Sequence, residues 1–374
     1  MEIKIFCFNV NGLRSLDKFI CEKMKMTFND WLLHLDYDIY CFQEIKGSEE
    51  TLKKYFILED FCAFASFHVK PNLHGVMTLV RKNGLVTKVE EIEKGRILLT
   101  DHGNFRVLNC YLPFLDENRY EEDELKIKIK EIMKIYRKVD EIVEKQNDIF
   151  ICGDLNTTYN MSDNFLYQQE LERLVYIDKV MDISNINKYD RELETKKNGR
   201  EVFVEASAIK NTNQLIKVFE PDFYRKVCDL SENGIFTAKI KPKYAELPFY
   251  YLTVRNLYGR FMEKEQRKWL YSLLNKDVVD LYRVKHDGLF KYTCWDIQKS
   301  HRKINLGTRI DYILLKTQND WNLISAEIED EIFGSDHCPV SIEIEIDLEK
   351  IKSYKNLLVK PRTIKDFFKP NKNV

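Results

Sequence analysis

The sequence predicts an α/β protein, in which buried strands alternate with amphipathic helices. Short runs rich in β-branched and aromatic residues recur along the chain and stop at polar or turn-forming residues. Between several of them, apolar residues return every three or four positions, as they do on one face of a helix. The 374 residues are 44% hydrophobic and 13% aromatic, which is enough to bury a large core and argues against global disorder.

Seven runs are expected to form strands. In chain order they are EIKIFCF (2–8), DIYCF (38–42), HGVMTLV (74–80), NFRVLNCYL (104–112), NDIFICGD (147–154), RIDYILL (309–315) and PVSIEIEI (339–346). The last run alternates between apolar residues, such as Val340 and Ile342, and polar ones, such as Ser341 and Glu343. That pattern predicts a strand with one buried face.

Two helices are expected between these strands. One spans about Asp17 to Leu35, ahead of the second strand. The other lies between Asn118 and Asn147, where apolar residues recur at steps of four and three: Leu125, Ile129, Ile132, Tyr136, Val139 and Val143. Such spacing is typical of a long helix with one apolar stripe.

The composition argues against several classes of protein. No run approaches 18 consecutive apolar residues, so no membrane span is expected. The nine cysteines form no CxxC pair, which argues against a zinc ribbon or a dithiol redox site and favours buried, reduced thiols. The formal net charge is only −1, so a polyanion would have to bind a local positive surface.

The expected organisation is a catalytic domain over residues 1–348, interrupted by an insertion at about 159–260, and a basic tail over residues 349–374. The insertion lacks the polar strand ends described below. From Lys350 onward the tail holds seven lysines and one arginine against a single acid, Asp366, a composition typical of a solvated, disordered extension.

The predicted strands end in a recurring set of amides, carboxylates and one histidine. These are Asn9 with Asn11, Gln43 with Glu44, Tyr111, Asp154 with Asn156, Arg309 with Asp311, and Asp336 with His337. Residues two apart on a strand share a face, so Asn9 with Asn11, and Asp154 with Asn156, could point into one cavity. Oxygen ligands without a thiolate cluster suit a hard cation such as Mg²⁺ or Mn²⁺.

Each of these residues also has an ordinary structural explanation. Asp154 and Asn156 could form an Asx turn, and His337 alone could be a structural histidine. Glu44 alone could be a surface charge, and Trp295 a core residue. The repetition of one chemical character at six strand ends favours a shared site over six separate coincidences.

Five segments, NVNGLR, FQEIK, CGDLNT, GTRIDYIL and GSDHCPV, together resemble the signature motifs of the exonuclease III/AP endonuclease family, in the same chain order. The run YTCWDIQKSHRKINLGTRIDYIL is similar to the eukaryotic AP endonuclease 2 branch. The resemblance covers about residues 1–158 and 261–346. It implies a DNase I-like, four-layer α/β sandwich, with two packed mixed β-sheets flanked by helices. It also implies a Mg²⁺-dependent DNA repair nuclease, with Mn²⁺ as a substitute.

The resemblance implies a role for each polar strand end. Glu44 would be the principal metal ligand, and the other residues at or near the metal would be Asn9, Asn11, Asp154, Asn156, Asp336 and His337. Asp154 would activate the attacking water, and Asp311 would fix the His337 ring. Tyr111 and Asn156 would bind the phosphoryl oxygens.

The substrate implied by the resemblance is double-stranded DNA, cut 5′ to abasic sites and trimmed at damaged or mismatched 3′ ends in base excision repair. The residues expected to contact DNA are Arg14, Lys46, Trp295, Arg302 and Arg309. Three positions depart from the pattern of abasic-site specialists. Cys294 and Thr308 replace aromatic residues of the sugar pocket, and Phe114 replaces a polar residue that contacts phosphate.

The tail contains PRTIKDFFKP, in which Ile364, Phe367 and Phe368 have the spacing of a motif that binds the sliding clamp PCNA. The usual glutamine is absent, and packing of the two rings on the enzyme itself is the alternative. A monomer in the nucleus is expected, with mitochondria as the alternative location.

Two other functions remain open at this point. The same fold could act on another phosphoester, for example as an RNA 3′ exonuclease of the deadenylase type. A scaffold that binds DNA without cutting it is the other alternative, and the retention of every expected catalytic position argues against it.

Overall fold

The computed structural model describes residues 2–70, 72–170, 195–196, 199–205, 235–239, 254–286 and 291–346. They divide into two compact units, one comprising Met1–Thr157 with Trp269–Val374 and the other Thr158–Lys268. The second unit brackets the stretch 159–260 that the sequence analysis set apart. The tail, with Ile364, Phe367 and Phe368, lies outside the described residues, so its clamp-binding motif stays a prediction.

The first large sheet of unit one has six strands in the order β16-β17-β1-β2-β4-β3. Their bounds are Glu2–Asn9 (β1), Ile39–Gln43 (β2), Phe61–Phe67 (β3), Gly75–Arg81 (β4), Trp321–Ile328 (β16) and Val340–Ile346 (β17). β1 pairs in parallel with β2, and the other neighbours are antiparallel.

The second large sheet has the order β12-β15-β8-β7-β6-β5. Its strands are Lys88–Glu93 (β5), Ile97–Asp101 (β6), Arg106–Tyr111 (β7), Ile149–Asp154 (β8), Val278–Asp280 (β12) and Asp311–Lys316 (β15). Only β7 and β8 pair in parallel. A short ribbon of β13 (Cys294–Trp295) and β14 (Gly307–Thr308) extends from this unit.

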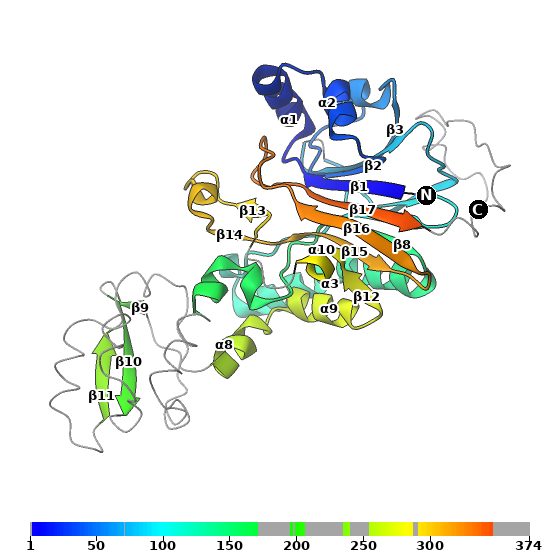
Figure 1. Ribbon diagram of the computed structural model, residues 1–374. Helices are drawn as coiled ribbons and strands as arrows, with labels where there is room; N and C mark the ends of the chain where they lie inside the picture. The colour runs from blue at the N-terminus through cyan, green and yellow to red at the C-terminus, as the bar shows by residue number, and fades with distance from the viewer. Residues whose placement is uncertain are drawn as a thin grey trace. The chain divides into compact units, whose positions relative to one another are not determined.

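Helices cover the outer faces of both sheets, which completes four layers (Figure 1). On the first sheet, α1 (Leu13–Phe19) and α2 (Phe28–Leu35) bury Leu16 and Trp31 against the Phe6 and Phe8 rings of β1. On the second, α3 (Glu122–Lys145) packs its Tyr136 ring against Trp269 of α9 (Glu265–Leu274). α10 (Leu281–Lys285) follows β12. The predicted four-layer sandwich of two mixed sheets is therefore confirmed.

A buried pair of side-chain amides links the two large sheets. The free thiols of Cys7, Cys41, Cys110 and Cys152 are buried, as expected from the sequence. The Gln43 amide on β2 donates a 2.8 Å hydrogen bond to the Asn109 side chain on β7, which joins the two sheets. This buried amide pair is satisfied, so it links the sheets without leaving an unpaired polar group.

All seven predicted strands form within about two residues of their expected bounds. The prediction of one helix over residues 17–35 is wrong, because two helices form there. α1 continues into a π turn, Ile20–Met24, and the helical conformation ends there, before α2 begins. Lys25 adopts a left-handed conformation with φ 59°, and Thr27 caps α2 by accepting a hydrogen bond from the Asp30 N–H. A serine or threonine cap favours the start of a helix because its hydroxyl accepts a backbone N–H of the first turn, which has no partner within the helix.

The second unit contains β9 (Thr195–Lys196), β10 (Gly199–Glu205), β11 (Ile235–Lys239) and α8 (Val254–Phe261). Within it, Tyr167, Leu257 and Phe261 form a small buried cluster. Among the described helices of the chain, none is long and apolar enough to cross a membrane.

Candidate active site

The polar strand ends predicted from the sequence meet at one end of the sandwich. The registers of β1, β2, β7, β8 and β15 place Asn9 beside Gln43, and Asp154 between Tyr111 and Asp311. Gly153 lets β8 reach this position, because it has φ 147° and any Cβ there would lie 1.9 Å from the Cys110 carbonyl oxygen. The glycine before Asp154 is therefore a requirement of the strand pairing.

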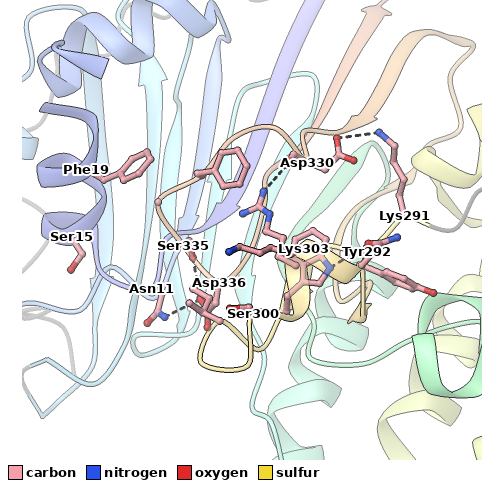
Figure 2. Close-up of a pocket in the computed structure, with 16 residues that line it drawn as sticks. Asn11, Ser15, Phe19, Lys291, Tyr292, Ser300, Lys303, Asp330, Ser335 and Asp336 are labelled. Atoms are coloured by element: carbon pink, nitrogen blue, oxygen red, sulfur yellow. Dashed lines mark hydrogen bonds and ion pairs between the residues drawn. The ribbon is translucent and has the colours of Figure 1, made fainter. Parts of the chain in front are cut away.

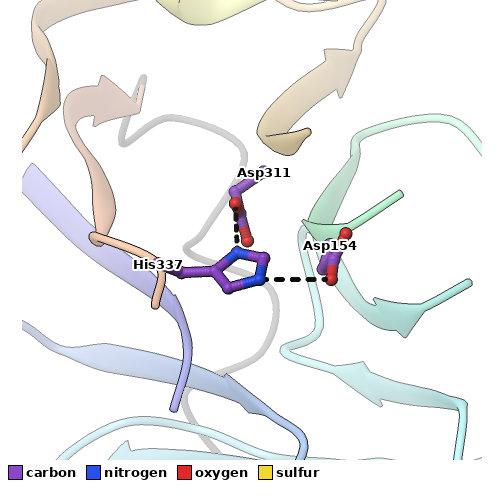
Figure 3. A group of neighbouring side chains, drawn as sticks. All are labelled: Asp154, Asp311 and His337. Atoms are coloured by element: carbon purple, nitrogen blue, oxygen red, sulfur yellow. Dashed lines mark hydrogen bonds and ion pairs between the residues drawn. The ribbon is translucent and has the colours of Figure 1, made fainter. Parts of the chain in front are cut away.

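Asp154, Asp311 and His337 form a buried group, shown in Figure 3. The Asp311 Oδ2 atom lies 2.8 Å from His337 Nδ1, and Asp154 Oδ2 lies 4.0 Å from His337 Nε2. The ring is thus held between two carboxylates. The Thr293 hydroxyl accepts the Asp311 N–H at 3.1 Å and so fixes the start of β15.

These three groups shift one another's pKa. Burial, followed by the negative charge of Asp311, raises the pKa of Asp154 to about 8. Burial opposes the charged form of His337, but the Asp311 carboxylate outweighs it and raises the imidazole pKa well above its usual range. His337 is therefore an N–H donor on both sides, and Asp154 is a stronger base than an exposed carboxylate.

A second group of side chains lies around Glu44 and Asn11. The Lys46 ammonium forms an ion pair with Glu44 Oε2 at 2.7 Å and also donates to the Asn11 side-chain oxygen. Asn11 in turn donates to Asp336 Oδ1 at 2.9 Å. Burial raises the pKa of Glu44, but Lys46 and Asn9 outweigh it and hold the carboxyl below its ordinary value. Glu44 therefore stays ionised.

Asn9 connects the two groups. Its amide nitrogen donates to Glu44 Oε1 at 3.1 Å and to Asp154 Oδ2 at 2.9 Å. The Asn9 side-chain oxygen accepts the Asn11 N–H at 3.1 Å, so it faces the backbone. The Asn9 side-chain amide therefore links the Glu44 and Asp154 carboxylates.

Tyr111 and Asn156 complete the site. Burial and the nearby charges of Glu44 and Asp154 raise the pKa of the Tyr111 phenol, which therefore keeps its proton and is hydrogen-bonded to Glu44. The Asn156 N–H donates to Asp154 Oδ1 at 2.9 Å, and its side-chain amide donates to the Leu112 carbonyl at 2.8 Å. Asn156 thereby orients the Asp154 carboxylate.

The chemistry of these residues fits a divalent cation. The ionised Glu44 carboxylate, the Asp336 carboxylate and the Asn11 amide oxygen are hard oxygen donors of the kind that Mg²⁺ prefers. The Lys46 ammonium, held by Glu44 and Asn11, shows that this corner of the site attracts positive charge. Glu44, Asn11 and Asp336 could therefore hold a metal, and so could Asp154, Asp311 and His337, whose ligand atoms all lie within 4.8 Å of one another.

Of the five residues expected to contact DNA, Arg14 is exposed on α1, and Lys46 is paired with Glu44. Trp295 is buried at 5% exposure, with its edge toward Asn305. Arg302 is committed within the chain, because it donates to the carbonyls of residues 330 and 332 at 2.7 and 2.8 Å.

The expectation for Arg309 is wrong. Its side chain is 1% exposed and forms two hydrogen bonds, of 2.7 and 2.6 Å, with the Asp280 carboxylate. The guanidinium also lies over the rings of Tyr282 and Tyr312, 5.0 and 4.5 Å from their centroids. A buried charge with its partner in place has no access to a DNA phosphate.

Sequence reasoning missed two residues that support the site. The Ser335 hydroxyl donates to the Asn9 carbonyl at 2.8 Å and accepts the His337 N–H at 3.2 Å, which fixes the loop carrying Asp336. Arg96 donates to the Tyr111 carbonyl at 3.1 Å and lies over its ring. Ser335 could have been found as a turn-forming residue within GSDH, whereas nothing local marks Arg96.

Comparisons with known proteins agree with this arrangement. A sequence profile described as the Endonuclease/Exonuclease/phosphatase family matches residues 7–337. The chain is 22% identical over 352 residues to an exodeoxyribonuclease of Bacillus subtilis, which covers 92% of this chain and 100% of that protein. It is 22% identical over 388 residues to the DNA-(apurinic or apyrimidinic site) endonuclease 2 of Xenopus laevis, covering 90% of this chain and 59% of that protein.

Shorter and structural matches point the same way. The Schizosaccharomyces pombe DNA-(apurinic or apyrimidinic site) endonuclease 2 is 31% identical over 123 residues, which are 29% of this chain and 23% of that protein. The matched parts are thus less than two thirds of both endonuclease 2 relatives. The crystal structure of the Xenopus laevis APE2 catalytic domain aligns with a TM-score of 0.56 at 19% identity and covers 91% of each chain, which supports a common fold.

Proposed function

This chain belongs to the endonuclease/exonuclease/phosphatase family, and from that premise we propose that it is a Mg²⁺-dependent DNA repair nuclease of the AP endonuclease 2 type. The proposed reactions are hydrolysis of the phosphodiester 5′ to an abasic site and removal of damaged or mismatched nucleotides from 3′ ends. The names of the relatives support DNA as the substrate. The convergence of Glu44, Asp154 and His337 at one end of the sandwich is the observation that carries the proposal.

In the proposed mechanism, Asp154 accepts a proton from the attacking water. Its raised pKa, near 8, makes it a suitable base, and Asn156 holds the carboxylate in place. His337, protonated and fixed by Asp311, donates an N–H toward the phosphoryl oxygens as negative charge builds up on them. The Tyr111 hydroxyl is proposed to donate a hydrogen bond to the same phosphoryl oxygens.

The metal is proposed to be Mg²⁺, with Mn²⁺ as a substitute, held by Glu44, Asn11 and Asp336. When bound, the cation offsets the negative charge that makes a phosphodiester resistant to hydroxide. Lys46 would then have to give up part of its ion pair with Glu44, and its ammonium would become available to a phosphate.

Two further proposals rest on the sequence alone. The tail motif at Ile364, Phe367 and Phe368 is proposed to bind the sliding clamp PCNA, and the protein is proposed to act in the nucleus as a monomer. A pull-down with the clamp tests the first of these. If the clamp captures a Phe367→Ala, Phe368→Ala variant as well as the wild type, the motif does not mediate clamp binding.

The test of the main proposal is a cleavage assay in Mg²⁺ with three substrates: a duplex bearing one abasic site, a duplex with a recessed mismatched 3′ end, and poly(A) RNA. We expect cleavage of both DNAs. Cleavage of the RNA alone would instead favour a deadenylase-like enzyme.

Two variants assign the cleavage to the site. Loss of one group that stabilises the transition state typically costs about 100- to 1,000-fold in rate. Asp154→Asn and Glu44→Ala should therefore each fold normally and lose at least about a hundredfold in rate. Near-native turnover of either purified variant would overturn these roles. Circular dichroism checks that each variant is folded.

A further inference from the structure

A cavity of about 910 Å³ lies next to the candidate active site, between α1 and the β13–β14 ribbon (Figure 2). The two residues of β13 face different compartments, since Cys294 contacts His337 whereas Trp295 lines the cavity. Asn11 and Asp336, which are hydrogen-bonded to each other, also line it. The cavity therefore lies on the other side of β13 from His337, and two of the proposed metal ligands form part of its lining.

One wall of the cavity is a rigid stack of flat groups. The Arg302 guanidinium lies 4.7 Å from the centroid of the Trp295 ring and 4.3 Å from that of the Phe333 ring. Its two hydrogen bonds to the carbonyls of residues 330 and 332 keep it in this position. Phe333 itself is 53% exposed, so one side of the stack stays open to the cavity.

The opposite wall comes from α1, which carries Ser15 and Phe19 (Figure 2). Gly334 allows the loop that follows Phe333 to approach α1 closely. A Cβ on this residue, which has φ 112°, would lie 2.8 Å from Leu16 and 3.0 Å from Phe19. The loop that carries Phe333 therefore packs directly on α1, and both Phe19 and Phe333 line the cavity.

The lining matches the chemistry of a nucleobase. Aromatic faces stack on bases of any sequence, and an exposed side-chain amide such as that of Asn305 can hydrogen-bond to a base edge. Lys303 at the rim is exposed and can meet a phosphate. The volume lies within the range of about 300–1,000 Å³ that is typical of ligand sites, so a whole nucleotide fits.

We propose that this cavity receives an unpaired nucleobase from the nucleotide beside the scissile linkage, with Phe333 as its stacking surface. This inference rests on the proposed nuclease function. A base that has already lost its pairing leaves the helix at less cost than a paired one, so the cavity would favour mismatched over matched 3′ ends. Phe333 would then determine specificity without taking part in the chemistry.

The test compares Phe333→Ala and Phe333→Leu with a matched control, Tyr271→Ala, which truncates an exposed aromatic residue of α9. The substrate is a duplex whose recessed 3′ nucleotide is 2-aminopurine, either paired with thymine or mismatched with guanine. The first readout is the ratio of trimming rates for mismatched and paired ends in Mg²⁺. We expect both Phe333 variants to lower this ratio by roughly fivefold or more, because stacking on the ring is lost, and Tyr271→Ala to leave it unchanged.

The second readout is independent of cleavage. In EDTA, the mismatched 2-aminopurine should be quenched on binding to the wild type and not on binding to Phe333→Ala. An equal ratio and equal quenching in the wild type and both Phe333 variants would overturn the inference. Failure of the proposed function looks different, since the wild type would then trim neither end.

Discussion

Replacing Arg309 by methionine gives the sharpest test of the structure against the sequence, because the two assign this residue opposite roles. The sequence suggested a DNA contact, whereas the structure buries the side chain against Asp280, with exposures of 1% and 6% for the two partners. Removing one partner of a buried pair leaves the other charge uncompensated, at a cost of about 3–5 kcal/mol. For a unit of this size we therefore expect the melting temperature to fall by about 6–20 °C.

The assay combines urea unfolding with the salt dependence of DNA binding. Each lost phosphate contact lowers the slope of log K against log salt by about 0.9, so Arg309→Met should leave the slope unchanged. Arg14→Met, which truncates an exposed arginine, is the matched control and should reduce the slope without affecting stability. A reduced slope with normal stability in Arg309→Met would refute the buried placement.

A double variant separates the orphaned charge from lost packing. Asp280 also caps α10, because its side chain accepts the Arg283 N–H at 3.4 Å. Asp280→Asn removes the charge and keeps the cap. Arg309→Met with Asp280→Asn should therefore be more stable than Arg309→Met alone. If the double variant is no more stable than the single one, the loss comes from packing rather than from an unpaired carboxylate.

Three further predictions follow from other contacts. Asp311→Asn should lower kcat by roughly 10- to 150-fold, since a hydrogen bond to a charged group is worth about 1.5–3 kcal/mol; an unaltered kcat would show that His337 needs no partner. His102 is buried against Phe105, and burial lowers its pKa to about 4 from an ordinary 6.5. The unfolded chain therefore binds the proton first, and stability present above pH 6.5 is lost as the pH falls toward 4, by up to about 3 kcal/mol. In His102→Gln, the midpoint of urea unfolding should depend less on pH between 6.5 and 4. An unchanged pH dependence would show that other groups cause the loss of stability in acid. Thr27→Ala removes the cap that separates α2 from the π turn and should cost about 0.5–2 kcal/mol in the same unfolding assay, without altering cleavage.

The sequence predicts the buried strand β8 and misses the edge strand β5. β8 is buried along its whole length, so its apolar run is unmistakable. β5, in contrast, is an edge strand with no fully buried residue, and its run KVEEIE carries three acids. An edge strand is fixed by pairing with its neighbour rather than by burial, and pairing leaves little trace in local composition.

The residues of the site were predictable, but their partners were not. Motif order singles out Glu44 and Lys46, yet only the structure shows the ion pair between them. The same limit explains the error at Arg309. Its partner Asp280 lies on another strand, 29 residues earlier in the chain, and a long-range pair of this kind has no local signature.

The two-residue spacing of the polar residues does not place them on one face of a strand. Asn11, Glu44, Lys46 and Asn156 all have positive φ, between 45° and 51°, so they stand in left-handed turns just beyond the strands. Asn9 therefore joins Glu44 to Asp154, while Asn11 turns away to Asp336.

Left-handed conformations are uncommon for side chains other than glycine, and they persist where the surroundings hold them in place. Here the Ile45 N–H donates to the Gly75 carbonyl at 3.1 Å, and the Leu13 N–H donates to the Ile45 carbonyl at 3.2 Å, which pins the turn between Glu44 and Lys46. Asp154 and Asn156 form the Asx-type contact expected of a simple turn, and the same contact orients the proposed base. The structural explanation of this pair and its proposed catalytic role are therefore compatible, since the turn also fixes the position of the carboxylate.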